Sequence, residues 1–158
     1  MIGKGHKRIG FIGWQKETSL RYKGYKDALE KHGLIADDRL YVECATEYNS
    51  GYDETYALMN QSKHDRPTAI IAFNDCSAIS AIEALWKMGF KIPEDVGVAT
   101  IGGQENLRLS SLRLTSAVLP FESIIREAVI MLNEQIENEN WRKGPILCPC
   151  RLNIGNSA

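Results

Sequence analysis

At 158 residues the chain is long enough for one α/β domain, or for one domain and a fragment of a second. A hydrophobic content of 44% and a charged content of 25% are typical of a soluble globular protein. A net charge of −1 gives no electrostatic footprint for nucleic acid, and no apolar run is long enough to cross a membrane. The N-terminus has no leader pattern, so we expect a cytoplasmic protein without membrane partners.

The first unit of the chain is predicted to be a buried strand followed by a helix. Residues 8–13 form a short apolar strand that ends in glycine, and Thr18 or Ser19 can cap a helix running to about His32. Arg21 falls in the first turn of that helix, where a cation is unfavourably placed in the field of the helix dipole. This placement favours a role in holding an anionic or hydroxyl-rich ligand, but a solvated surface arginine is an equal alternative.

The next two units repeat the order of strand and helix. Residues 40–44 are predicted to form a strand and residues 52–63 a helix. Residues 69–73 form a continuous apolar strand, and the helix after it is predicted to start at Asp75 as N-cap and to end before Gly89. Regular alternation of strands and helices predicts an α/β fold, a doubly wound and mostly parallel sheet.

Two polar residues directly follow the third predicted strand. In a parallel β-α-β unit, Asn74 and Asp75 lie at the carboxyl end of a strand, where open α/β sheets bind ligands. Asn74 is therefore the first candidate for a binding residue. The alternative is purely structural, with Asn74 shaping the turn and Asp75 capping the helix.

The alternation changes after a fourth predicted strand at residues 96–101. Residues 114–118 read as a strand with no helix before it. A helix is predicted from Pro120 to about Asn138, with an apolar stripe on one side and charged residues mostly opposite. Residues 145–154 form a last extended segment.

Catalytic and metal-binding patterns are not convincing anywhere in the chain. Cys148 and Cys150 are separated by one residue rather than two, and no second pair of Cys or His stands nearby. With Cys44 and Cys76 they are predicted to be reduced structural thiols, and neither a metal nor a cofactor is expected. No Ser-His-Asp set or glycine-rich phosphate loop is present, so we expect no enzyme.

Seven short stretches occur in order over nearly the full length of the chain. They are Gly5–Gly13 (GHKRIGFIG), Arg21–Leu29 (RxxGYxxAL), Ser50–Tyr52 (SGY), Pro67–Asp75 (PTAIIAFND), Ala81–Gly89 (AIEALWKMG), Ile92–Val96 (IPEDV) and Leu114–Ser116 (LTS). Together they resemble the C-terminal half of the effector-binding core of LacI/GalR-type transcription regulators. The resemblance implies a periplasmic-binding-protein-like fold, in which two α/β subdomains hold an effector in the cleft between them.

The resemblance also implies a division of the chain. Residues 1–116 correspond to the C-terminal effector-binding subdomain, and residues 117–144 to a crossover segment and helix that normally pack on the absent N-terminal subdomain. Residues 145–158 correspond to the returning C-terminal strand. The helix-turn-helix of the family has no counterpart here, so DNA would be bound only through that absent domain. We expect the helix of the crossover segment to pack in a way unlike the family or against a second copy.

Site residues follow from the resemblance position by position. Arg21, Asn74 and Asp75 match effector-binding positions. The further candidates for contact with the effector lie in loops and are Gln15, Glu17, Thr46, Tyr48 and Gly103. Ile79 and Ile82 match the dimer-facing surface of the family, but a role in the core facing the sheet is an equal alternative.

Four residues depart from the pattern of the family. Gly102 and Gly103 stand where an acidic residue is common, Thr46 where an aromatic residue is common, and Leu119 where a polar residue is frequent. A carboxylate that grips sugar hydroxyls would therefore be absent there, which favours a less hydroxylated or different effector.

The sequence thus favours the ligand-sensing part of a dimeric LacI-type regulator, binding a sugar or related metabolite. A solute-binding protein of a sugar transport system shares the fold and is the alternative, although such a protein would carry a leader.

Overall fold

The computed structural model describes residues 1–44, 50–102, 107–138 and 140–158. Its strands are β1 (Ile9–Gly13), β2 (Tyr41–Glu43), β3 (Ala69–Ala72), β4 (Gly97–Gly102), β5 (Arg108–Leu109), β6 (Leu112–Arg113), β7 (Thr115–Val118) and β8 (Arg151–Asn153). Six of them form one sheet in the order β2-β1-β3-β4-β7-β8. The first five run parallel, and β8 pairs antiparallel to β7. The mostly parallel α/β sheet predicted from the sequence is confirmed.

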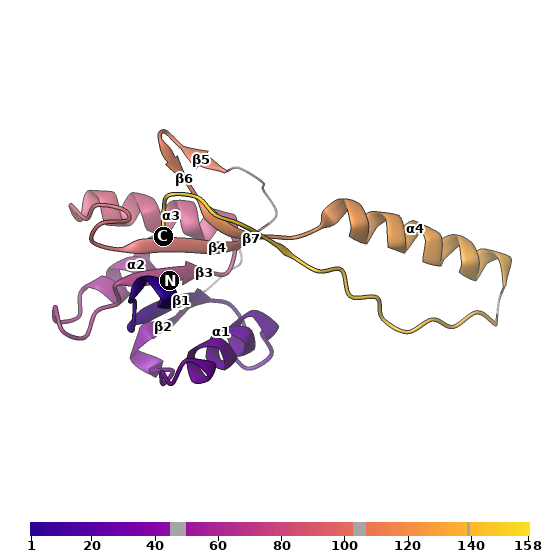
Figure 1. Cartoon of the computed structure of the whole chain (residues 1–158), viewed down its shortest axis with the longest axis horizontal. Coiled ribbons are helices and arrows are strands. Elements are labelled where there is room, and N and C mark those ends of the chain that lie inside the picture. Colours follow the sequence, from indigo (N-terminus) through magenta and orange to yellow (C-terminus); the bar gives the residue numbers. More distant parts are fainter. Residues whose placement is uncertain (45–49, 103–106, 139) are drawn as a thin grey trace.

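Four helices and two short 3-10 turns accompany the sheet. They are η1 (Ile2–Lys4), α1 (Leu20–Lys31), η2 (Asp38–Leu40), α2 (Tyr52–Met59), α3 (Asp75–Lys87) and α4 (Phe121–Glu137). The first three long helices lie on both faces of the sheet, whereas α4 stands apart (Figure 1). Alternation along β1 explains the two-sided winding. Phe11 contacts Tyr22 and Tyr25 of α1, and the neighbouring Gly10 approaches Leu58 of α2 on the opposite face.

Helix ends follow capping chemistry, with two corrections to the sequence-based boundaries. Ser19 caps α1 as predicted, accepting a hydrogen bond from the backbone N–H of Tyr22. The N-cap of α3 is Asn74 and not Asp75, because the Asn74 Oδ1 accepts from the Ser77 N–H at 2.8 Å. Helix α2 ends at Met59 rather than at residue 63. The residues that follow it form a separate turn, in which the Ser62 hydroxyl donates to the Asp65 carboxylate.

The hairpin of β5 and β6 was not predicted from the sequence. Its strands are two residues long, and Ser110 in the turn between them adopts a positive φ of 58°. Strands of this length show too little alternation of apolar and polar residues to be recognised.

The core lies between the sheet and the helices of its two faces. Phe11, Ile70 and Val98 of the sheet are fully buried, and so are Ile82 and Leu85 of α3. Burial of Ile82 favours the core role over the dimer-facing one that the resemblance suggested. Ile79 is half-buried on the same helix.

Helix α4 has a different environment from the other helices. None of its residues, all of which are described, is buried. It follows β7 after two residues and projects away from the sheet, and residues 140–150 return beside it in extended form (Figure 1). Within the described ranges of the chain, no helix is long and apolar enough to cross a membrane.

Candidate functional site

Asn74 and Asp75 lie where the sequence places them, at the carboxyl end of β3 and the start of α3. Both side chains are partly buried and take part in the local structure. Asn74 caps the helix, a role that the structural alternative had given to Asp75. The Asp75 carboxylate lies across the end of the neighbouring strand, because its Oδ1 accepts a hydrogen bond from Thr100 Oγ1 at 3.2 Å.

Gly102 makes room for the Asp75 carboxylate. A Cβ on Gly102, the last residue of β4, would overlap the carboxylate of Asp75. The acidic group that family members often carry after the fourth strand is absent from this position. The Asp75 carboxylate lies against Gly102, so an acidic side chain is present at this edge of the sheet.

Thr100 is a site residue that the sequence reasoning missed. It is 3% exposed and sits in a strand that is otherwise apolar or glycine. The sequence did contain a signal for Thr100. It is a hydroxyl residue two positions before the carboxyl end of a buried strand, and such a group needs a hydrogen-bond partner.

Gln15 and Glu17 lie together at the adjacent strand ends. They line an open hollow of about 510 Å³ with Lys16, Thr18 and Glu43, at the carboxyl ends of β1 and β2. Gln15 adopts a positive φ of 54°, and its carbonyl accepts the Ser19 N–H at 2.9 Å. The turn that starts α1 therefore fixes the backbone around this hollow. Because β1, β2, β3 and β4 run parallel, this hollow and Asp75 share one edge of the sheet.

Arg21 is separate from the hollow. It lies in the first turn of α1, as predicted, with an exposed side chain, and it is absent from the lining of the hollow beside Gln15. Thr46, Tyr48 and Gly103 lie outside the described residues.

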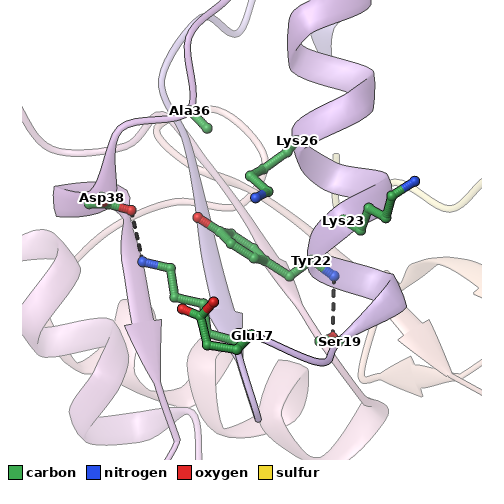
Figure 2. A pocket seen from close by; sticks show the side chains of 8 residues that line it. Glu17, Ser19, Tyr22, Lys23, Lys26, Ala36 and Asp38 are labelled. Carbon is green, nitrogen blue, oxygen red and sulfur yellow. Dashed lines mark hydrogen bonds and ion pairs between the residues drawn. The ribbon is translucent and has the colours of Figure 1, made fainter.

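A second hollow of about 440 Å³ opens between α1 and the segment around Asp38. Figure 2 shows Tyr22 extending from α1 across it, with Lys26 alongside. Lys16 Nζ lies 2.8 Å from Asp38 Oδ1 and 4.8 Å from the centre of the Tyr41 ring. The hydrogen bond to Asp38 raises the pKa of Lys16. Within this second hollow, the Lys16 ammonium thus pairs with Asp38 and lies over the rings of Tyr22 and Tyr41.

The cysteines show no metal-binding arrangement. Cys44 is buried, and burial raises the pKa of its thiol to about 11. Cys76 and Cys150 are exposed, and Cys148 is half-buried. Across the described part of the chain, no three His, Cys, Asp or Glu side chains are grouped so as to hold a metal ion.

Comparison with known proteins shows which family the chain resembles. Periplasmic binding protein-like domains match residues 1–158. The chain is 28% identical over 157 residues to the HTH-type transcriptional repressor CytR of Escherichia coli (strain K12), covering 98% of this chain and 46% of CytR. It is 30% identical over 164 residues to catabolite control protein A of Priestia megaterium, covering 99% and 48%. It therefore spans about half the length of the curated relatives it matches.

A solved structure agrees with these matches. The transcriptional regulator CelR, in complex with cellobiose, superposes with a TM-score of 0.85 at 26% identity, covering 99% of this chain and 48% of that one. The match over the whole chain, with the parallel sheet and its edge of polar residues, leads to one conclusion. The chain belongs to the periplasmic binding protein-like domain family, in the form that makes up the effector-binding domains of LacI/GalR-type transcription regulators.

Proposed function

We propose that the chain senses a small hydroxyl-bearing metabolite at the carboxyl edge of its parallel sheet, as part of a transcriptional repressor. The observation that carries this proposal is the Asp75 carboxylate, held by Thr100 and accommodated by Gly102. A carboxylate offers only acceptors, so it suits hydroxyl or amine donors of a ligand.

The surroundings of Asp75 suit such a ligand. Gln15 and Glu17 add an amide and a second carboxylate on the same edge, around a hollow large enough for a small metabolite. Arg21, Thr46, Tyr48 and Gly103 remain predicted contacts of the effector. The comparisons add that two curated relatives are named as regulators and that CelR was solved with a sugar.

In this proposal the effector acts by shifting a conformational equilibrium. A ligand held between two subdomains stabilises the closed arrangement in proportion to its preference for that arrangement. The subdomain that reads DNA would respond to the change, so the chain contributes one wall of the sensor. The hydroxyl-rich side of a sugar, or of the ribose of a nucleoside, would face Asp75.

Thermal unfolding with added ligands tests the proposal on the protein with both walls of the cleft present. Sugars, nucleosides and purines are screened singly, because a ligand present at one hundred times its Kd raises the free energy of unfolding by about 2.7 kcal/mol. We expect one class to raise the Tm and Asp75→Asn to remove the rise. Asp27→Asn, an exposed position in the middle of α1, is the matched control and should keep it.

Two results would contradict the proposal. One is a Tm that none of these ligands changes. The other is a stabilising ligand whose effect survives Asp75→Asn, since that ligand would bind elsewhere on the chain.

A further inference from the structure

Three buried polar side chains meet at the carboxyl edge of the sheet. Ser77, in the first turn of α3, is fully buried, and Cys44 and Ser50 are each 3% exposed. The hydroxyl oxygens of Ser50 and Ser77 lie 3.1 Å apart, which is hydrogen-bond distance. Burial raises the pKa of the Cys44 thiol to about 11, and hydrogen bonds with the two hydroxyls oppose that rise. We call these three side chains the Ser77 cluster.

The Ser77 cluster joins three separate elements of the fold. Cys44 directly follows β2, and its N–H donates to the Gly13 carbonyl at the end of β1 at 2.7 Å. Ser50 comes shortly before α2, and Ser77 belongs to α3. A buried hydroxyl that loses its partner costs more free energy than the hydrogen bond contributes, so each member of the cluster constrains the others.

A close backbone contact lies beside the Ser77 cluster. Gly51 has a positive φ of 116°, and a Cβ at this position would overlap the Ser77 carbonyl. The Gly51 N–H donates to the Glu54 carboxylate at 2.6 Å, and its carbonyl accepts from the Thr55 hydroxyl at 2.5 Å. The start of α2 is therefore fixed on the first turn of α3.

Ser77 also connects the cluster to the candidate site. Its hydroxyl pairs with Ser50, and its backbone N–H donates to Asn74 Oδ1 at 2.8 Å. Asp75 follows Asn74 in the chain, and its carboxylate accepts from Thr100 Oγ1 of β4 at 3.2 Å. Hydrogen bonds and one short turn thus link the carboxyl ends of β1, β2, β3 and β4.

Two further predicted contacts of the effector are bounded by the cluster in sequence. Thr46 and Tyr48 lie between Cys44 and Ser50. The side chains of both bounding residues are hydrogen-bonded at Ser77. The same buried hydroxyl therefore holds the described residue on each side of that segment.

We propose that Ser77, paired with Ser50 and Cys44, is a positioning residue for effector binding. Ser77 is fully buried, so it acts through Asn74 and Asp75, whose turn it fixes. A binding group has to be held to within about 0.5 Å of its productive position by the side chains behind it. This role rests on the proposed function, since it concerns the same edge of the sheet.

Amide hydrogen exchange tests the positioning without any ligand. Ser50→Ala takes one partner from the buried Ser77 hydroxyl, so the turn that begins α3 should open more often. We expect exchange of the Ser77 N–H to become about tenfold faster or more. Circular dichroism checks that the variant is folded.

Ser157→Ala provides the matched control. Ser157 is fully buried like Ser77, and its hydroxyl donates to the Val98 carbonyl at 2.7 Å and accepts from the Thr115 N–H at 2.8 Å. These bonds lie at the amino ends of β4 and β7, at the opposite edge of the sheet. The control should lower overall stability but change exchange of the Ser77 N–H by less than about twofold.

Calorimetric titration extends the test to the effector, on the protein with both walls of the cleft present. Cellobiose, adenosine and hypoxanthine serve as probes of the sugar, nucleoside and purine classes. For a probe that binds the parent, Ser50→Ala and Ser77→Ala should each raise the Kd about tenfold or more, and Ser157→Ala by less than about twofold. The double variant leaves neither hydroxyl without the other, so its loss should be smaller than the product of the two single losses.

Three outcomes would overturn this role of Ser77. Unchanged exchange of the Ser77 N–H in Ser50→Ala would show that the cluster does not hold the turn. Binding of a probe that both single variants leave unchanged would overturn the positioning role alone. No binding of any probe by the parent would overturn the proposed function and the positioning role together.

Discussion

Helices α3 and α4 are both amphipathic, yet only α3 is packed. Six residues of α3 are buried, whereas none of α4 is. The sheet and α2 provide the surface for α3, and small side chains such as Ala78, Ala81 and Ala84 allow it to lie close to them. An apolar stripe thus determines which side of a helix avoids water, but a neighbouring surface must exist for the stripe to be buried.

The comparison divides the molecule into a packed body, residues 1–118 and 151–158, and the α4 arm, residues 119–150. Most of the free energy of unfolding should come from the body, because buried apolar area is the main favourable contribution to folding. Matched substitutions in the two regions can test this division.

The largest difference in stability between the two regions is expected when an isoleucine of each is replaced by alanine. Ile82→Ala in the body should lower the free energy of unfolding by about 2–5 kcal/mol, because it leaves a cavity in a closed core. Ile130→Ala on the arm, where the side chain is 41% exposed, should lower it by about 1 kcal/mol or less. Urea unfolding followed by circular dichroism measures both. If Ile82→Ala weakened self-association without lowering stability, Ile82 would be a dimer contact instead.

The second comparison replaces a glycine of each region with alanine. Gly102→Ala should cost about 1–3 kcal/mol, because the added methyl group must displace the Asp75 carboxylate. Gly144→Ala on the arm meets open space and should change stability by about 0.5 kcal/mol or less. Thermal unfolding compares the two variants. Equal stabilities would show that Asp75 moves without cost and is not held at the end of β4.

Replacing a serine of each region with alanine should have a smaller effect on stability. Ser19→Ala should lower stability by about 1 kcal/mol, because α1 loses the acceptor for the Tyr22 N–H. Ser123→Ala, on the exposed side of α4, removes no cap and should leave stability within about 0.5 kcal/mol of the parent. The same urea titration serves both variants, and a similar loss in the two would argue against capping by Ser19.

The last comparison measures the reactivity of cysteine thiols in the two regions and needs no change in stability. Because burial raises the pKa of Cys44 to about 11, its thiolate is scarce at pH 8 and a disulfide reagent cannot reach it. Cys148 and Cys150 on the returning segment should react in the native protein, and Cys44 only after unfolding. Fast reaction of all four cysteines at pH 8 would indicate that the body opens readily.

The sequence by itself determined the order of the elements and the position of the candidate edge. Runs of apolar residues ended by polar ones predicted the parallel strands, and their alternation with helices placed Asn74 and Asp75 at strand ends. The Ser19 cap and the extent of α4 were also predictable, because capping and helical spacing are local properties of the chain.

Only the tertiary structure decided which partners these residues take. Thr100 and Asp75 are 25 positions apart, so their hydrogen bond depends on β3 and β4 lying side by side. The same packing fixed Ile82 in the core, a choice that helical spacing left open. It also left Ala99, Ala117 and Leu152 of the sheet partly exposed and every residue of α4 unburied, because burial depends on which surfaces meet and a sequence pattern does not contain that information.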